Sequence, residues 1–157
     1  MWNFRLAGAA CMLVFSALAN ATSPGTTVTF VCEHGSAKSV IAAAYFNKIA
    51  EEKGLKFRAV SRGLTPDPQL QSATQTGLTK DGLNTATFIP TKLNAEDAQV
   101  SVKVITIGIE HEPEFLPTNK LAEWDGVPAV SAGYEPARDD MLKRIESLIV
   151  ELQATEK

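Results

Sequence analysis

The sequence predicts an α/β domain, a three-layer sandwich in which a four-stranded, mostly parallel sheet lies between helices. Short runs rich in β-branched residues alternate with amphipathic segments, which is the pattern of parallel βαβ units. The run Val100–Ile109 is almost continuously apolar, as expected of a strand covered on both faces. Residues 22–157 are long enough for one buried core, so we expect a single domain there.

The first 21 residues have the pattern of a secretory signal peptide. Arg5 supplies a positive start, Leu6–Leu18 is apolar, and Ala19-Asn20-Ala21 matches a cleavage site. An uncleaved membrane anchor is the alternative, although the apolar run is short for a membrane span. We therefore expect an exported protein, periplasmic or secreted, that has no membrane association after cleavage.

The charge and the cysteine content of the chain restrict the classes of function that it could have. Without Arg5 the chain has 14 basic and 18 acidic residues, a net charge of −4, and no basic patch that indicates a nucleic-acid partner. Cys11 would leave with the signal peptide, so the mature chain could form no internal disulfide. Cys32 is then a lone cysteine in an exported protein. This indicates a reactive thiol, with an inert cysteine at a strand end as the alternative.

The segment around Cys32 predicts a strand, a tight loop and a helix in direct succession. Thr27–Val31 is β-branched and aromatic, and Val40–Ala50 places apolar side chains along one helical face. Ser39 is a candidate cap at the start of this helix, and Gly54 is expected to end it.

The later elements follow from the same patterns. Asn94 is expected to cap a short helical turn, and Pro136 suits the first turn of the last helix. The other expected elements are a second strand (Lys56–Ser61), a loop (Arg62–Pro68), a helix (Leu70–Leu83), a third strand (Val100–Ile109), a loop (110–125), a short fourth strand (Gly126–Val130) and a last helix with an apolar stripe (Met141, Leu142, Ile145, Leu148, Ile149, Leu152).

A strand, a tight loop and a helix N-terminus together predict an anion site. The first N–H groups of a helix lack intrahelical partners, and the helix dipole favours a thiolate at Cys32. Gly35 permits a left-handed turn in the loop. A thiolate that faces a bound oxyanion indicates nucleophilic attack on phosphorus or a similar centre. The backbone N–H groups expected to hold the anion belong to Glu33, His34, Gly35, Ser36, Ala37, Lys38 and Ser39.

Cys32, five intervening residues, Lys38 and Ser39 resemble the phosphate loop of the low-molecular-weight protein tyrosine phosphatases and of the related thioredoxin-coupled arsenate reductases. Their loop has Cys, five residues, Arg and then Ser or Thr, directly after the first strand. This sequence keeps the cysteine, the spacing, the serine and the position. It has Lys38 in place of the Arg and Gly35 where the family usually has Asn. The resemblance extends from about Thr27 to Leu152.

The resemblance implies that phosphomonoesters are hydrolysed through a Cys32 thiolate and a phosphocysteine intermediate, with no cofactor. It also implies that the Ser39 hydroxyl stabilises the thiolate. Lys38 offers a point charge rather than a planar two-donor fork. Loss of such an oriented donor pair costs roughly 10²–10³ in rate, so we expect weak activity. The partner would be a phosphorylated small molecule, a phosphoprotein or an inorganic oxyanion.

The family's general acid is an Asp, usually before Pro, on a late loop. Here Ala129 occupies the matching position, and Asp125 lies four residues earlier. Asp125 would have to reach the site by a rearranged loop; otherwise it is a turn residue before Gly126. A non-catalytic oxyanion-binding module therefore stays open as the alternative.

An arsenate reductase-like enzyme is a third alternative. The mature chain lacks the two further cysteines of the intramolecular relay, so such an enzyme would use an external thiol. His34 and His111 have no metal-ligand spacing, and we expect no metal site.

Overall fold

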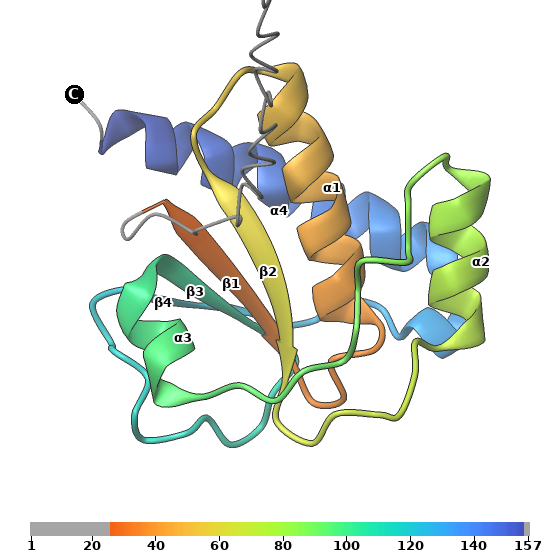
Figure 1. Ribbon diagram of the computed structural model, residues 1–157, viewed down its shortest axis with the longest axis horizontal. Helices are drawn as coiled ribbons and strands as arrows, with labels where there is room; N and C mark the ends of the chain where they lie inside the picture. The colour runs from red at the N-terminus through yellow and green to blue at the C-terminus, as the bar shows by residue number, and fades with distance from the viewer. Residues whose placement is uncertain (1–25, 156–157) are drawn as a thin grey trace, which may run out of the picture.

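A computed structural model describes residues 26–155 and has a four-stranded, fully parallel sheet at its centre (Figure 1). The predicted signal peptide lies outside the described residues. The strand order is β2-β1-β3-β4, and β1 therefore pairs with a neighbour on each side. The strands are β1 (Thr27–Cys32), β2 (Arg58–Gly63), β3 (Ser101–Ile107) and β4 (Leu121–Trp124). The predicted α/β class and parallel sheet are confirmed.

The helices cover the sheet on both faces (Figure 1). Helices α1 (Lys38–Glu52) and α4 (Tyr134–Ala154) pack on one face, and α3 (Ala95–Val100) packs on the other. Helix α2 (Ser72–Lys80) packs against α1 and α4 rather than on the sheet. No helix within residues 26–155 is long and apolar enough to cross a membrane.

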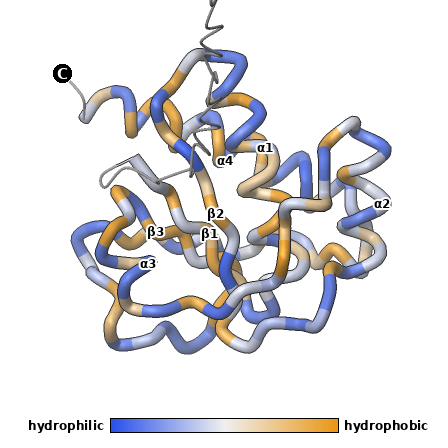
Figure 2. The backbone as a smooth tube through the Cα atoms, viewed as in Figure 1, coloured by the Kyte–Doolittle hydropathy of each residue, from blue (hydrophilic) through white to orange (hydrophobic). Residues whose placement is uncertain are grey.

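Strand alternation divides the core into two parts. Phe30 of β1 faces α1, where its ring contacts the rings of Phe46 and Trp124. The next residue, Val31, faces the smaller cluster under α3. Hydrophobic and hydrophilic residues also alternate along α4 in Figure 2, as expected of a helix with one face in the core. The predicted apolar stripe of this helix is buried or partly buried along its length.

The fourth strand is not where the sequence predicted it. It runs from Leu121 to Trp124, within the segment expected to be a loop, and it pairs with Val104–Ile107. Gly126 has a φ of +72°, which breaks an extended run, and Pro128 has no N–H for a ladder. Residues Val130–Ala132 form a 3₁₀ turn instead.

Several helix and strand boundaries differ by a few residues from those predicted. Strand β2 begins at Arg58 rather than Lys56, and α2 is shorter at both ends than the predicted Leu70–Leu83. The predicted end of α1 at Gly54 is confirmed by its φ of +63°, and Asn94 caps α3 by accepting a hydrogen bond from a backbone N–H.

The Asp81 carboxylate ties three helices together at the C-terminus of α2. It accepts hydrogen bonds from the hydroxyls of Tyr45 and Tyr134 and from the guanidinium of Arg138. These donors, the Tyr45 hydroxyl above all, lower the pKa of Asp81. Burial, together with hydrogen bonds between Tyr45, Tyr134 and Asp81, raises the pKa of Tyr134. The cluster therefore holds its charge and its shape at neutral pH.

Replacing Asp81 with Asn should lower the free energy of unfolding at pH 7 by about 1–3 kcal/mol, because buried donors lose a charged acceptor. The folded-state pKa of Asp81 lies below its unfolded value of about 3.8, so its contribution is complete above that pH and is lost as the pH falls through the folded pKa. Stability of the unmodified protein should therefore fall more steeply below about pH 4 than stability of the variant. Urea unfolding followed by circular dichroism at several pH values measures both effects.

The matched control is Asp139→Asn. Asp139 pairs with the same Arg138 guanidinium but is 57% exposed, so its loss should change stability little. An equal loss of stability in both variants would contradict the central role of Asp81.

Candidate active site

Cys32 is the last residue of β1 and lies at the carboxyl end of the parallel sheet. The carboxyl end is where ligands bind in such sheets. The side chain is only 6% exposed, and its Sγ lies 3.2 Å from the fully buried Ser39 Oγ, to which the thiol donates. When the sulfur ionises, the same hydroxyl can donate to the thiolate. Ser39 therefore contacts the sulfur, as expected from the resemblance.

Helix α1 begins at Lys38, and no side chain of residues 26–155 caps its N-terminus. Ala37 occupies the cap position without a side-chain hydrogen bond, and the first turn contains no acidic residue. The prediction that Ser39 caps the helix is wrong, because Ser39 is already inside the helix and its hydroxyl accepts from Cys32. The positive end of the dipole is thus left uncompensated beside the thiol.

The loop between β1 and α1 directs its carbonyl groups away from the Cys32 thiol. The carbonyls of Cys32, Glu33, His34 and Ser36 accept hydrogen bonds from backbone N–H groups of the segment 64–71. None of the N–H groups from Glu33 to Ser39 donates to an acceptor within residues 26–155. Because unpaired amides need an acceptor, this arrangement forms a nest for an anion.

Gly35 makes the turn of this loop possible. Its φ is +59°, and a Cβ there would lie 2.8 Å from the backbone nitrogen of Gly63. A Cβ on Gly63 would in turn lie 2.6 Å from the nitrogen of Gly35. Two backbones thus pass in contact at the end of β2, and neither position accommodates a larger residue without a shift. The left-handed turn expected at Gly35 is present.

Lys38 adds a cation to the same place. Its side chain is partly buried and has no ion pair or hydrogen bond with the described residues. The ammonium reaches the end of β3, where it lies 3.2 Å from the position of a Cβ on Gly108. A lysine at a helix N-terminus opposes the dipole, so two positive features converge with no counterion among residues 26–155. An anion would neutralise both.

These groups line a cavity of about 190 Å³ above the sulfur. Its predicted members are Cys32, Glu33, His34, Ala37 and Lys38. Gly35 and Ser36 of the loop and Ser39 of α1 are buried and do not line the cavity. Five other residues of the wall have no signal in the sequence that marks them as part of the site: Gln71, Ile107, Gly108, Val130 and Ser131. These residues come from three separate segments, and no local pattern joins them.

Asp125 is not among the residues that line the cavity. It is exposed in the turn after β4, and its backbone carbonyl accepts a hydrogen bond from Arg144 of α4. Ala129, the residue at the family's acid position, does line the cavity. Within residues 26–155 the Asp125 carboxylate is therefore not brought to the cavity that contains the thiol.

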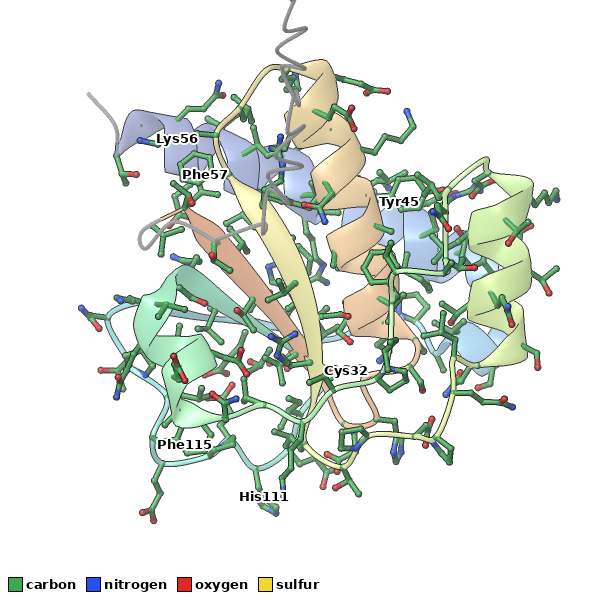
Figure 3. The ribbon with its side chains drawn as sticks, in the orientation of Figure 1. Cys32, Tyr45, Lys56, Phe57, His111 and Phe115 are labelled. Carbon is green, nitrogen blue, oxygen red and sulfur yellow. The ribbon has the colours of Figure 1, made fainter. Side chains whose placement is uncertain are left out.

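The histidines lie on different segments of the site region. The imidazole Nδ1 of His34 lies 3.7 Å from Asp67 Oδ1, while His111 lies at the margin of the molecule, apart from Cys32 (Figure 3). Within residues 26–155 no three His, Cys, Asp or Glu side chains gather as metal ligands would.

Comparison with known structures identifies the fold. YfkJ from Bacillus subtilis superposes with a TM-score of 0.74 at 21% identity, covering 83% of this chain and 96% of that one. The thioredoxin-dependent arsenate reductase Cg_ArsC1' of Corynebacterium glutamicum gives 0.69 at 23% identity, covering 85% and 64%. The low molecular weight protein tyrosine phosphatase of T. tengcongensis gives 0.67 at 20% identity, covering 80% and 99%. Phosphatases and arsenate reductases thus share this architecture.

The sequence comparison assigns the family. No curated protein matches the chain. Residues 27–125, more than half of the chain, match the model of the family described as low molecular weight phosphotyrosine protein phosphatase. The match begins with β1 and contains the whole of the loop that follows Cys32. The chain therefore belongs to the low molecular weight phosphotyrosine protein phosphatase family.

Proposed function

We propose that this protein hydrolyses phosphomonoesters slowly, through a Cys32 thiolate and a phosphocysteine intermediate. The observation that carries this proposal is the row of amides from Glu33 to Ser39, which donate to no acceptor within residues 26–155. The same cavity contains the Cys32 thiol and the Lys38 ammonium, which pairs with none of the described residues. A phosphoryl group fits such a nest because its oxygens accept several hydrogen bonds at once.

The chemistry follows from the position of each group. The amides and Lys38 would hold the phosphoryl oxygens while Cys32 Sγ attacks phosphorus, forming an S–P bond as the P–O bond of the ester breaks. The leaving oxygen takes a proton from solvent. Water then attacks the phosphocysteine, the S–P bond breaks, and phosphate leaves. The Ser39 hydroxyl stabilises the thiolate that re-forms.

Two features would keep the rate low. Lys38 offers a point charge where a guanidinium would hold two oxygens in plane. Ala129 lines the cavity where the resemblance places the general acid, so an alkoxide would leave without assistance. Esters of acidic alcohols such as phenols, whose oxygens leave readily as anions, should therefore be the better substrates.

Oxyanion binding without turnover is the second candidate. The observation that favours it is the same Ala129, because binding needs the amides and the cation but not an acid. Arsenate reduction is a third candidate, supported by the fold shared with the Corynebacterium glutamicum reductase. Cys32 is the only cysteine after residue 11, so reduction would need a thiol from another molecule.

We also propose that the protein is exported, on the basis of the apolar segment Leu6–Leu18 and the site Ala19-Asn20-Ala21. Expression of the full chain in a bacterium, followed by fractionation and mass spectrometry, should recover a periplasmic or secreted protein that lacks residues 1–21. Recovery of the intact chain in the cytosol would contradict export.

Hydrolysis of an aryl phosphate tests the catalytic proposal. We expect slow turnover that Cys32→Ser abolishes and that Lys38→Arg raises about tenfold or more, because the fork restores two oriented donors. Lys38→Gln, which removes the charge, should lower turnover below that of the unmodified protein. Absence of turnover in the unmodified protein and in Lys38→Arg, with phosphate or arsenate still bound, would exclude the hydrolase and leave oxyanion binding. Arsenate turnover with glutathione or a redoxin would instead support reduction.

A methyl group on Gly108 tests the position of Lys38. In Gly108→Ala the new Cβ would lie 3.2 Å from the ammonium, so the cation must shift and phosphate should bind more weakly. Gly54→Ala is the matched control, because Gly54 shares the positive φ but has open space around its Cβ position. Both variants should lose about 1 kcal/mol of stability, and only Gly108→Ala should lose phosphate affinity measured by calorimetry. Equal affinities in the two variants would contradict the prediction that phosphate binding depends on the position of the Lys38 ammonium beside Gly108.

A further inference from the structure

We propose that Asp67 is a positioning residue that holds the anion-binding loop in its working shape. This inference rests on the oxyanion site of the proposed function, but not on hydrolysis. Asp67 lies in the loop after β2, and neither the cavity nor the chemistry described above uses its side chain.

Asp67 contacts the loop on both sides of Gly35. Its carboxylate Oδ2 accepts a hydrogen bond from the Ser36 hydroxyl, and its backbone N–H donates to the His34 carbonyl at 3.0 Å. Its other carboxylate oxygen lies 3.7 Å from the imidazole Nδ1 of His34. Asp67 thus contacts both neighbours of Gly35. The left-handed turn at Gly35 directs the backbone N–H groups of the loop toward the cavity.

The Ser36 hydroxyl shows why the contact matters. Ser36 is fully buried, so its hydroxyl has no access to solvent, and Asp67 is its only partner among residues 26–155. Loss of the acceptor would leave a buried polar group unsatisfied, and the loop would have to move to relieve it. A movement at Ser36 changes the direction of the adjacent amides.

Asp67 is itself held firmly. It lies between Pro66 and Pro68, which restrict the backbone on both sides. Neighbouring residues bind the same loop: the N–H of Thr65 donates to the Glu33 carbonyl at 2.8 Å, and the N–H of Gln71 donates to the Ser36 carbonyl at 3.1 Å. A side chain on a rigid segment can set the position of a loop, because little freedom is left to lose.

The charge of Asp67 argues against a merely electrostatic role. A carboxylate near an anion site repels the ligand, so its charge alone would weaken binding. Asp67 strengthens the site by accepting a hydrogen bond, a task that the amide oxygen of Asn can also perform. Asp67→Asn should therefore retain the function that Asp67→Ala loses.

The test measures arsenate and phosphate affinity by calorimetry, together with the rate at which iodoacetamide alkylates Cys32 across pH. Asp67→Ala and Ser36→Ala should each weaken anion binding about tenfold and slow alkylation near neutral pH. The double variant should bind no more weakly than either single variant, because both remove the same contact. Asp67→Asn should bind within about threefold of the unmodified protein.

The matched control is Asp97→Ala. Asp97 is 13% exposed and accepts two hydrogen bonds from Arg62, at 2.8 and 2.9 Å, without contacting the loop. Its loss should lower the free energy of unfolding while leaving anion affinity and alkylation unchanged. If Asp67→Ala behaves as this control does, Asp67 only stabilises the fold and the proposal is wrong. If Asp67→Ala does not fold, Ser36→Ala, which removes the donor of the same hydrogen bond, decides in the same way.

The outcomes also separate this proposal from hydrolysis. Anion binding that depends on Asp67, in a protein that turns over no aryl phosphate, would support the positioning role and exclude the phosphatase. Absence of any phosphate or arsenate binding by the unmodified protein would overturn both.

Discussion

The whole site depends on the outward direction of four carbonyl groups. Because the segment 64–71 binds the carbonyls of the loop after β1, the opposite sides of those peptide units, their N–H groups, face the cavity. The register of β1 with β2, which places Cys32 beside Gly63, brings that segment to the loop. Contact between the backbones of Gly35 and Gly63 then restricts the conformation of the loop. An anion-binding nest results from backbone geometry before any side chain is added.

Side chains decide what this nest can do. Lys38 supplies charge without a planar fork, and Ala129 occupies the wall where a carboxylic acid would assist a leaving group. The site should therefore retain anion binding better than catalysis. Binding an anion needs net positive charge, whereas stabilising a transition state needs oriented donors. The backbone of the site is thus suited to binding oxyanions, while its side chains limit turnover.

Contacts that lie far from the nest hold helix α1 in place. Tyr45 of α1 and Tyr134 of α4 both donate to Asp81, and Phe46 packs its ring against Phe30 of β1. Helix α1 cannot rotate without breaking these contacts. Its uncapped N-terminus consequently stays directed at Cys32, even though a helix start without a cap is locally unfavourable. Stability gained in the core thus offsets a weakness that the site requires.

The sequence by itself determined the elements whose signals are local. A β-branched run, a cysteine, a glycine-containing loop and an amphipathic helix predicted β1, the loop and α1, because period and turn chemistry act over a few residues. The same reasoning placed the fourth strand wrongly, because an edge strand such as Leu121–Trp124 is defined by its neighbour β3 rather than by its own composition. Tertiary structure alone decided the cavity wall, the position of Asp125 away from the thiol and the contact of Asp67 with Ser36. These depend on segments that are far apart in the chain and meet only when the parallel sheet assembles.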